Sequence, residues 1–398
     1  MTAFTVLISG AGLGGLCLAQ SLRQAGINVQ IFERDKGPWD RPQGYRLHID
    51  SDGAQALAEA LPPDLYSLFD ATSMKPQPFT TIVDTSFRPL RQGMHNDSVA
   101  PGLHLNVDRA TLRQILLTGL EEIIHFGRKL THYESDDSGV VALFENGQMA
   151  RGDVLVGADG TRSAVRKQRL PHAQLQDTGV WAIYGRIPME SARKVVPEQA
   201  LKDVFTVAVD AKKLFLGLGP VVFPVRPDLA AATLMPKSQL RKQDDYVVCI
   251  VGGRRELFGH EDFDLRQLSS EALQKLSKDL ISDWPDPTRA LAAYADPKSF
   301  FFVEMFTSVP TTLPPSPNVT LLGDAVHTMT PTLGRGANIA MRDAACLASY
   351  LKRAVEGTLS LSRALSEYEA EMSKYSFEVV KESAVMGAKL MGQDPLPE

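Results

Sequence analysis

The chain has 398 residues, of which 44% are apolar and 22% are charged. That composition supplies a large buried core, and the length predicts either two domains or one large α/β domain with an insertion. The formal net charge of −5 argues against nucleic acid or an anionic membrane surface as a partner. The sequence has no stretch of about 18 apolar residues, so we expect no membrane anchor.

The three cysteines are spaced too far apart for a paired metal or redox motif. Cys17 and Cys346 fall in apolar helical segments, which favours buried, reduced thiols, a cytoplasmic location and no metal site. A buried strand is predicted to begin at residue 4, which leaves no room for a signal peptide, and the tail 391–398 is polar. We therefore expect a soluble protein.

A strand, a glycine-rich turn, a helix and a second strand are predicted for the first 33 residues. Their expected bounds are 4–9, 10–15, 16–25 and 29–33. In the turn, Gly10 allows a sharp bend, Gly12 allows a pyrophosphate to approach the backbone, and Gly15 allows the helix to pack closely on the strand. Glu33 ends the second strand, where a carboxylate can accept hydrogen bonds from an adenosine ribose. The unit predicts dinucleotide binding, with phosphates at the positive end of the helix.

Short elements are predicted after this unit. Expected in order are a loop at 34–44, a strand at 45–49 and a helix capped by Ser51 or Asp52. A later helix is introduced by Asp108, and it has Arg109 and Arg113 four residues apart on its polar side. The spacing alone predicts a solvated helix face for both arginines.

The remaining chain contains a region dominated by strands. A hairpin is predicted around Asn146-Gly147, and its second arm leads into Gly157-Ala-Asp-Gly-Thr-Arg-Ser163. Strand-like runs interrupted by one helix, at 270–284, predict a second, mostly antiparallel domain. Its expected strands are 181–187, 205–209, 214–218, 221–225, 246–251 and 300–305. A strand at 319–322, a glycine-rich loop at 330–336, a buried helix at 337–351 and a long helix at 361–390 that packs across both domains complete the chain.

Three separated motifs occur in a characteristic order. They are Gly10-x-Gly12-x-x-Gly15 with Glu33, then Gly157-Ala-Asp159-Gly160-x-Arg162-Ser163, then Gly323-Asp324-Ala325-x-His327 with Pro331-x-x-Gly334-x-Gly336-Ala337-Asn338. Together they resemble the single-component (group A) FAD-dependent aromatic monooxygenases, which include para-hydroxybenzoate hydroxylase, salicylate hydroxylase and the tetracycline-inactivating monooxygenases. The resemblance covers most of the flavin-binding half and is weak across 180–306, as expected for a substrate domain.

The resemblance implies an α/β fold. We expect a Rossmann-like, glutathione-reductase-like FAD-binding domain, an inserted, mostly antiparallel β-sheet substrate domain and a long C-terminal helix. The expected FAD-binding segments are 1–75, 98–178 and 286–358, the substrate segments are 76–97 and 179–285, and the C-terminal helix and tail are 359–398. Neither a further C-terminal domain nor a C-terminal membrane anchor is expected, and the protein is expected to be a monomer or a homodimer.

The resemblance also assigns FAD-binding roles by position. The expected residues are Gly10, Gly12, Leu13, Gly14, Gly15, Glu33, Arg34, Arg46, Arg109, Asp159, Asp324, Pro331, Gly334, Gly336, Ala337 and Asn338. Among them, the glycines would hold the pyrophosphate, Glu33 with Arg34 the adenosine end, and the loop 331–338 would lie along the isoalloxazine. Arg109 would reach the ribityl and phosphate region and Asp324 the ribityl chain, while Asp159 resembles the motif that touches both FAD and the nicotinamide cofactor. This interpretation replaces the solvated face for Arg109 but not for Arg113.

Arg46 and His48 are the candidates for catalysis. One residue separates them on a predicted strand, so they share a face. Arg46 would orient an anionic substrate or the flavin edge, and His48 would take a phenolic proton near neutral pH. The alternative for both is an exposed strand residue. Further candidates are Phe215, Phe223, Met235 and residues 300–302 for an apolar pocket or plain core, Arg226 for a substrate carboxylate or phenolate, and His327 and Asp343 for structural roles.

In the resembled family, NADPH or NADH reduces FAD, and a flavin hydroperoxide then transfers one oxygen atom from O2 to a small molecule. We expect an aromatic or polyketide-like substrate and a role in secondary metabolism. The cofactor supplies that chemistry, and the protein supplies position, exclusion of water and electrostatics. The chain has no second Gly-x-Gly-x-x-Gly for a separate nicotinamide domain, in agreement with this family. Hydroxylation, epoxidation and Baeyer–Villiger insertion all stay open.

Other classes of protein are weighed against this hypothesis. An FAD-dependent dehydrogenase or reductase on the same fold stays open. A halogenase of this lineage is disfavoured, because Trp39, Trp181 and Trp284 stand alone and form no Trp-x-Trp motif. A non-catalytic carrier needs only the first motif, and a plain NAD dehydrogenase leaves the second and third motifs without a role. The three motifs together favour the monooxygenase.

Overall fold

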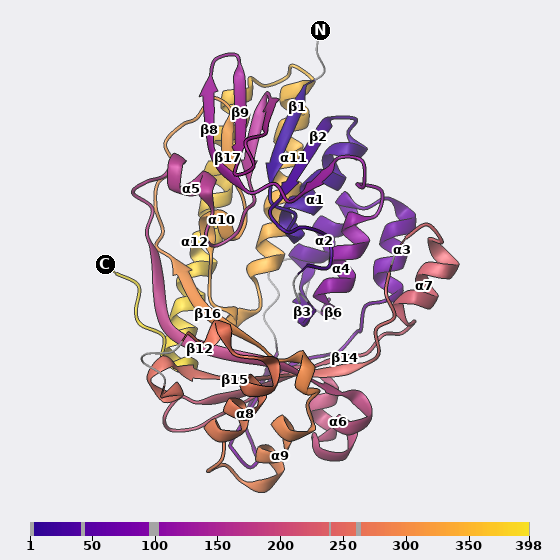
Figure 1. Cartoon of the computed structure of the whole chain (residues 1–398), viewed down its shortest axis with the longest axis vertical. Coiled ribbons are helices and arrows are strands. Elements are labelled where there is room, and N and C mark those ends of the chain that lie inside the picture. Colours follow the sequence, from indigo (N-terminus) through magenta and orange to yellow (C-terminus); the bar gives the residue numbers. More distant parts are fainter. Residues whose placement is uncertain (1–3, 41–43, 95–102, 239, 260–263, 398) are drawn as a thin grey trace.

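The computed structural model describes residues 4–40, 44–94, 103–238, 240–259 and 264–397. Residues 41–43, within the predicted loop 34–44, and the predicted domain boundary between 97 and 98 lie outside the described residues. A parallel sheet with its helices forms one end of the molecule, and a larger, mostly antiparallel sheet forms the other (Figure 1). The predicted α/β class with a second, β-rich layer is therefore confirmed.

The parallel sheet brings the three sequence motifs to one edge. Its order is β17-β11-β1-β2-β7, with bounds Val319–Leu321, Val154–Gly157, Thr5–Ser9, Asn28–Glu33 and Ile124–Phe126. The register pairs Ser9 with Gly157 and Gly157 with Leu321, so β1, β11 and β17 end level with one another. The loops that follow these strands contain the three motifs, and they therefore lie side by side at the carboxyl edge of the sheet.

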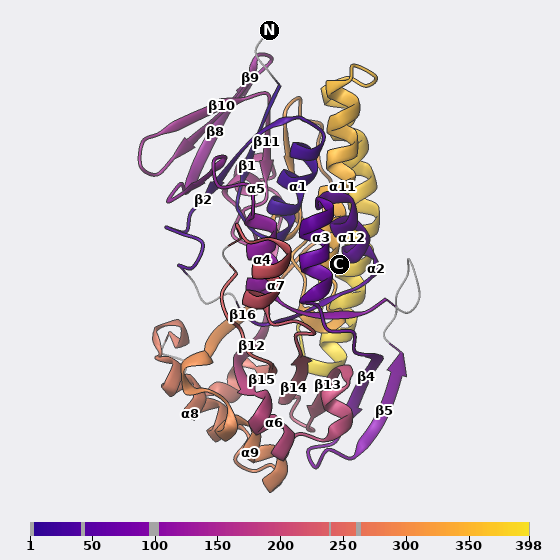
Figure 2. The same ribbon diagram turned by 90° about the vertical axis from the view of Figure 1, so that its right-hand side faces the viewer.

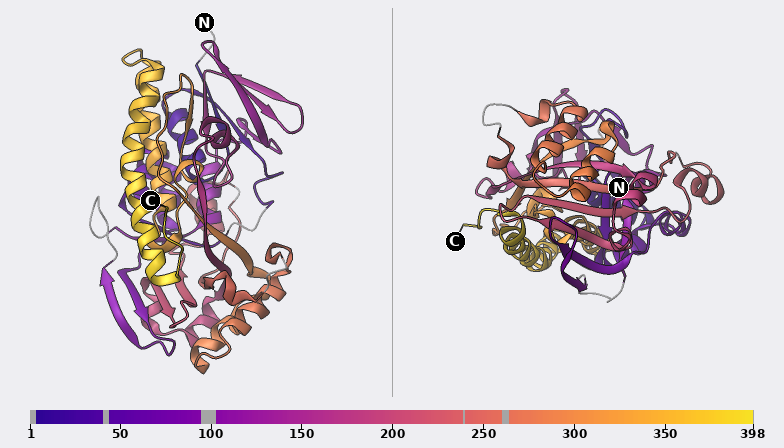
Figure 3. Two further views of the ribbon diagram at one scale, coloured as in Figure 1. Left: turned by 90° about the vertical axis from the view of Figure 1, so that its left-hand side faces the viewer. Right: turned by 90° about the horizontal axis from the view of Figure 1, so that it is seen from below.

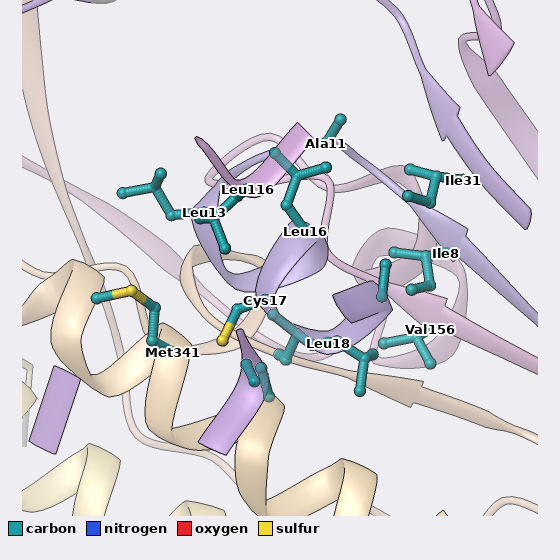
Figure 4. Packing of buried hydrophobic residues seen from close by; sticks show 14 of the residues in the cluster. Ile8, Ala11, Leu13, Leu16, Cys17, Leu18, Ile31, Leu116, Val156 and Met341 are labelled. Carbon is teal, nitrogen blue, oxygen red and sulfur yellow. The ribbon is translucent and has the colours of Figure 1, made fainter. Parts of the chain in front are cut away.

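Helix α1, Leu13–Gln24, is buried between this sheet and three other helices. Those helices are α2 (Ser51–Ala60), α4 (Arg109–Leu117) and α11 (Gly336–Val355). Figure 4 shows Leu16 and Leu18 of α1 among apolar residues of the strands, such as Ile8 and Val156. Cys17 lies in the same core, where burial raises the pKa of its thiol to about 12. It is a buried free thiol, as predicted.

The glycines set the position of α1. The helix begins at Leu13 rather than at the predicted residue 16, because the weak helix propensity of Gly14 and Gly15 hides its first turn in the sequence. Gly10 has a φ of +108°, and a Cβ on Gly15 would lie 2.3 Å from the carbonyl oxygen of Gly10. Side chains at these two positions would force the helix away from β1, so the tight turn and the close packing both require glycine.

A seven-stranded sheet forms the second layer. Its order is β16-β12-β15-β14-β13-β4-β5, with bounds Phe301–Ser308, Leu175–Pro188, Tyr246–Arg254, Phe215–Val221, Asp203–Val209, Gln77–Val83 and Pro89–Met94. All neighbouring strands are antiparallel except β13 and β4. Helices α6 (Met189–Val195), α8 (Ser270–Leu280) and α9 (Asp286–Tyr294) cover the face that points away from the parallel sheet, as Figures 1 and 3 show.

Three expectations for this layer differ from the structure. Val221 ends β14, so 221–225 is not a separate strand. Besides α8, the described residues contain α6, α9 and α7 (Pro227–Leu234), and these short helices begin at or beside a proline, which made their sequences resemble loops. β16 and α9 belong to this layer, which agrees with the strand expected at 300–305 in the second domain but not with the assignment of 286–358 to the FAD-binding domain. The rest of the domain division stays a proposal.

Helix α12, Leu361–Met391, runs along both layers (Figures 2 and 3). It contacts α11 and β17 near its start and β15 and β16 near its end, as the prediction for 361–390 required. The following tail is fixed to the seven-stranded sheet, where Asp394 forms an ion pair with Arg254 at 2.7 Å and donates its N–H to the carbonyl of Thr178. The helix and tail therefore hold the two layers at a fixed separation.

Shorter elements complete the fold. They are β3 (Arg46–Ile49) paired with β6 (Leu105–Asp108), the sheet of β8 (Leu130–Asp136), β9 (Gly139–Phe144) and β10 (Met149–Gly152), and helices α3 (Pro63–Ala71), α5 (Ala164–Arg169) and α10 (Asp324–His327). The predicted hairpin is β9–β10. The predicted cap of α2 is wrong: the helix already begins at Ser51, and Asp50 caps it by accepting a hydrogen bond from the N–H of Gly53 at 3.1 Å.

Asp108 connects the two layers. One carboxylate oxygen caps α4 by accepting a hydrogen bond from the N–H of Thr111 at 2.8 Å. The other accepts hydrogen bonds from the Tyr246 hydroxyl at 2.9 Å and from Nη2 of Arg186 at 3.3 Å, both on the seven-stranded sheet. Asp108 is only 1% exposed, so a neutral residue here would leave the Arg186 guanidinium without its counter-charge.

We expect Asp108→Asn to lower the free energy of unfolding by about 1–3 kcal/mol, because asparagine keeps the cap but loses the charged contacts with the second sheet. Urea denaturation monitored by tryptophan fluorescence measures the change. Tyr246→Phe, which removes one of these contacts and no charge, is the matched control and should cost less. Equal stability of Asp108→Asn and the unsubstituted protein would contradict a connecting role.

Candidate active site

A cavity of about 510 Å³ lies between the carboxyl edge of the parallel sheet and the seven-stranded sheet. All three sequence motifs contribute to its walls. Predicted site residues in these walls are Gly12, Leu13, Gly14, Gly15, Arg46, His48, Arg109, Asp324, Pro331, Gly334, Gly336 and Ala337. Five other predicted site residues do not line the cavity. They are Gly10, Glu33, Arg34, Asp159 and Asn338.

Two helix N-termini face the cavity. At the start of α1, a Cβ on Gly12 would meet no atom within 4 Å, and no side chain caps the helix. At the start of α11, Gly336 and Ala337 line the cavity, and no side chain caps that helix either. Both first turns also contain no acidic residue. The cavity therefore receives the positive ends of two helix dipoles, which is an arrangement that suits anionic groups.

The loop before α11 is shaped by Asn338, which is 0% exposed. Its amide donates hydrogen bonds to the carbonyls of His48 at 2.9 Å and Gly334 at 3.0 Å, and its oxygen accepts one from the N–H of Asp50 at 3.0 Å. Asn338 therefore shapes the loop from outside the cavity wall, and the expectation that the loop 331–338 lies along the isoalloxazine stays a prediction. The Asn338 amide fixes the left-handed turn at Gly334, whose φ is +66°.

The same loop is attached to α12. The hydroxyl of Thr332 donates to the carbonyl of Ser383 at 2.9 Å, and the hydroxyl of Ser383 donates to the carbonyl of Thr330 at 2.7 Å. The hydroxyl of Thr330 donates to Oε1 of Gln393 at 2.9 Å. The long helix and the first tail residues thus fix one wall of the cavity, and Leu390 and Met391 contribute directly to that wall.

Asp324 begins α10 and is exposed to the cavity. Its position within the protein, away from bulk water, raises the pKa of its carboxyl, whereas the positive charges of His327 and Arg109 oppose the rise. Behind it, Oδ2 of Asp343 accepts hydrogen bonds from the N–H of Gly323 at 2.8 Å and from Nε2 of His327 at 2.6 Å. His327 and Asp343 are both 0% exposed, which agrees with the structural roles expected for them.

Asp159 shapes the second motif loop from behind. Oδ2 accepts a hydrogen bond from the N–H of Ala164 at 2.8 Å, and Oδ1 has no hydrogen-bond partner among the described residues. Burial raises the pKa of this carboxyl. The neighbouring Gly160 and Thr161 line the cavity instead. The expected contact of Asp159 with FAD and the nicotinamide cofactor stays a prediction.

Arg113 is buried, contrary to the predicted solvated helix face. It is 2% exposed rather than solvated, and its guanidinium donates to the carbonyl of Ala11 at 3.0 Å and to the carbonyl of Pro38 at 2.8 Å. Glu33, which is 5% exposed, accepts a hydrogen bond from the N–H of Ala11 at 2.8 Å. Glu33 and Arg113 thus bind the N–H and the carbonyl of Ala11, and together they fix the glycine loop. Arg109 and Arg113 lie four residues apart on the same helix, and their spacing gave no signal that only Arg113 is buried.

Arg109 and Arg34 differ in environment. Arg109 lines the cavity, and its guanidinium lies 5.7 Å from the centre of the Tyr45 ring. Arg34 is exposed on the loop after β2. Arg109 therefore faces the cavity and not only bulk solvent, as the resemblance implied. The assignment of Glu33 and Arg34 to the adenosine end of FAD stays a prediction.

Arg46 and His48 are not exposed strand residues. His48 is 2% exposed, and its Nε2 lies 3.0 Å from Nδ1 of His104, with the two rings stacked at 5.2 Å. Arg46 reaches across to β13, where its guanidinium donates to the carbonyl of Val204 at 2.6 Å. Both side chains line the cavity, as their shared face on β3 predicted.

The pocket candidates divide by strand alternation. Phe215 and Phe301 line the cavity, whereas Phe300 and Phe302 pack in the core on the other side of the sheet. Phe223 and Met235 are core residues outside the wall. Arg226 is wrong as a substrate contact, because it forms an ion pair with Asp228 at 2.7 Å away from the cavity. The sequence analysis missed Tyr45, Tyr184 and Phe205, which the period of two along each strand could have identified.

Comparison with known proteins agrees with this geometry. The family model described as "FAD binding domain" matches residues 3–383. The FAD-dependent monooxygenase thnD of Trichoderma harzianum is 30% identical over 98% of this chain and 95% of that protein. The chain belongs to the FAD-dependent monooxygenase family. The predicted relationship to the group A flavin hydroxylases is confirmed.

Two further matches show how much of its relatives' length the chain covers and which fold it shares. The dual O-methyltransferase/FAD-dependent monooxygenase CTB3 of Cercospora beticola is 34% identical over 98% of this chain but only 47% of its own length, so the chain spans about half of such relatives. A crystal structure assigned as an FAD-containing monooxygenase, from Photorhabdus luminescens subsp. laumondii, has 30% identity and a TM-score of 0.81, covering 97% of this chain and 98% of that one. Among the described residues, no helix of this family member is long and apolar enough to cross a membrane.

We expect Asp324→Ala to weaken FAD retention by roughly 1.5–3 kcal/mol, because a ribityl hydroxyl would lose its charged acceptor. The ratio of flavin to protein absorbance after gel filtration measures the retention. Asp137→Ala, which removes an exposed carboxylate from the turn between β8 and β9, outside the cavity wall, is the control. Full flavin occupancy of the Asp324 variant would contradict its assigned role.

We expect Arg113→Met to lower the free energy of unfolding by about 1–3 kcal/mol and to weaken FAD binding, because the buried carbonyl of Ala11 would lose its donor. Thermal unfolding with and without added FAD separates the two effects. Arg109→Met should weaken FAD binding with a smaller loss of stability, because Arg109 faces the cavity. An Arg113 variant as stable and as well loaded as the unsubstituted protein would exclude the proposed contact with the glycine loop.

Proposed function

We propose that this chain is an FAD-dependent monooxygenase that uses NADPH or NADH and O2 to hydroxylate an aromatic or polyketide-like small molecule. One observation supports this most directly. A single cavity joins two uncapped helix N-termini and the Asp324 carboxylate to an aromatic pocket on the seven-stranded sheet. The two relatives named above as FAD-dependent monooxygenases support the same activity: the chain matches 47% of the length of CTB3 and 95% of the length of thnD.

The residues present fit FAD. The open backbone at Gly12 and the N-terminus of α1 would accept the pyrophosphate, as helix ends do for phosphates. Arg109 would contact the ribityl and phosphate region, and Asp324 would accept hydrogen bonds from the ribityl hydroxyls. The loop 331–337 would lie along the flavin ring. When bound, FAD supplies redox chemistry and the activation of O2 that no side chain provides.

The chain's own residues would then control position, charge and water. The N-terminus of α11 places a partial positive charge beside the proposed flavin-ring site, which favours an anionic form of the ring. Aromatic and aliphatic side chains of the seven-stranded sheet exclude water from the substrate end, which strengthens electrostatic interactions there. His48, buried at the cavity wall beside His104, is placed to accept a phenolic proton.

Absorbance and turnover measurements test this proposal. We expect the purified protein to be yellow or to become yellow with added FAD, and to oxidise NADPH or NADH faster in the presence of one member of a panel of phenols and aromatic polyketides. Mass spectrometry should find one added oxygen atom in the product, with the label from ¹⁸O2.

Each other outcome has its own meaning. Flavin reduction without an oxygenated product from any compound would replace the monooxygenase with an FAD-dependent dehydrogenase or reductase. A product with an inserted ester oxygen, or an epoxide, would change the reaction class on the same scaffold. A colourless protein that takes up no FAD would contradict the proposal as a whole.

A further inference from the structure

Arg46 is a partly buried cation that faces the cavity, and the hydrogen-bond partners of its guanidinium are neutral. Its Nε and Nη2 donate to Oδ1 of Asn106 at 3.1 and 2.6 Å, and Nη2 also donates to the carbonyl of Val204 at 2.6 Å. Both acceptors are neutral. Among the described residues Arg46 forms no ion pair, whereas the nearby Arg186 is paired with Asp108 at 3.3 Å. The charge of Arg46 is therefore solvated by neutral groups but not balanced.

The position of the guanidinium is fixed by residues around it. Asn106 is 0% exposed, and its amide donates to the carbonyls of Val204 at 3.2 Å and Pro220 at 3.0 Å, which directs its oxygen toward Arg46. The guanidinium carbon lies 5.3 Å from the centre of the Phe205 ring. A Cβ on Gly219 would lie 3.0 Å from Cδ of Arg46, so a larger residue there would crowd the side chain. These contacts preorganise a cation before any ligand binds.

An unbalanced cation at this depth is unfavourable. Burial lowers the pKa of Arg46 to about 9, although Tyr246 and Tyr184 nearby oppose the shift. Removing an ion from water costs several kcal/mol unless a counter-charge is supplied. The described part of the cavity wall contains one other arginine, Arg109, and no lysine. Arg109 lies beside Tyr45 and lowers the pKa of Asp324, at the end where the cofactor is proposed. Arg46 is therefore the cation of the substrate end.

The surrounding wall suits a flat ring system. Tyr184 and Phe301 stack with their centres 5.3 Å apart and their planes at 19°, and Tyr45 meets Tyr184 edge-on at 5.7 Å. Val248 and Ile250 of β15 line the same region. Aromatic faces bind planar π systems by stacking, and aliphatic side chains exclude water around them. The site thus combines one fixed cation with an apolar wall for a planar group.

We propose that Arg46 binds the ionised oxygen of the substrate, a phenolate or enolate on a planar aromatic ring system, and thereby determines which compounds this site accepts. The inference rests on the proposed function and adds the charge state of the substrate to it. The proton of the ligand passes to His48 at the cavity wall or to solvent, and the guanidinium donates hydrogen bonds to the resulting anion. A carboxylate on the same ring would satisfy Arg46 by the same chemistry, but a neutral ether would not.

The test titrates FAD-loaded protein with 7-hydroxycoumarin, whose anion and neutral form have different absorption spectra, and with 7-methoxycoumarin, a neutral compound of similar shape. We expect the hydroxycoumarin to bind as its anion, with its ionisation shifted to lower pH on binding, and the methoxycoumarin to bind about tenfold or more weakly. Arg46→Gln should weaken binding of the hydroxycoumarin about 10–100-fold and leave that of the methoxycoumarin and the FAD content unchanged.

Two further variants complete the design. Arg46→Lys keeps the charge without the planar fork, so it should retain the preference for the anion with several-fold lower affinity, and it replaces the glutamine variant if that variant does not fold. Arg193→Gln removes a positive charge from the exposed side of α6 and should change neither titration.

Several results would overturn the proposal. They are equal losses for both coumarins in Arg46→Gln, binding of the hydroxycoumarin in its neutral form, no binding of either compound, and loss of FAD rather than of the anion. Failure of the proposed function is seen separately, because it appears as a protein that takes up no FAD or makes no oxygenated product. The coumarin comparison between the unsubstituted protein and Arg46→Gln can be made whether or not FAD is taken up.

Discussion

The level ends of three parallel strands are the constraint on which the site depends. β1, β11 and β17 stop at the same edge of their sheet, so three loops that are far apart in the sequence form one surface. Glycine is needed where these loops touch, since a side chain on Gly10 would lie 2.3 Å from the carbonyl oxygen of Ala158. Glu33 and Arg113 then fix Ala11 from its N–H and its carbonyl. The cofactor surface is thus built by backbone positions, and side chains serve mainly to hold that backbone.

The seven-stranded sheet covers this surface and so completes the cavity. Asp108 bonds to both layers and is almost completely buried, and Asn106 also donates to carbonyls of the second sheet, so the layers meet through buried polar contacts. The cavity left between them has two ends of opposite character. One end has backbone N–H groups and Asp324, while the other has stacked aromatic rings and the Arg46 guanidinium. Both ends open into one space, so the proposed cofactor and substrate would share it.

Helix α12 makes the separation of the layers rigid. Tyr375 on this helix donates to Oδ1 of Asp343 at 2.7 Å, behind the loop that begins at Gly323. Further along, Ser383 bonds to the loop before α11, and the tail beyond the helix pairs with Arg254 on the seven-stranded sheet. One continuous element thus contacts the cofactor loops and the substrate sheet, which explains why so long a helix is needed on a domain of this size.

The sequence by itself determined the parallel sheet, the glycine loop, the cofactor class and the motif residues of the cavity wall, because glycine spacing and strand ends are local features with one physical use. It did not determine the burial of Arg113, the turn-fixing role of Asn338 or the pairing of Arg226. Each of those depends on which groups lie opposite after folding, and four-residue spacing cannot distinguish solvent from a neighbouring loop. Only the tertiary structure decided that Arg46 lies against β13 and forms no ion pair among the described residues, because the groups that surround a side chain are a property of three-dimensional packing.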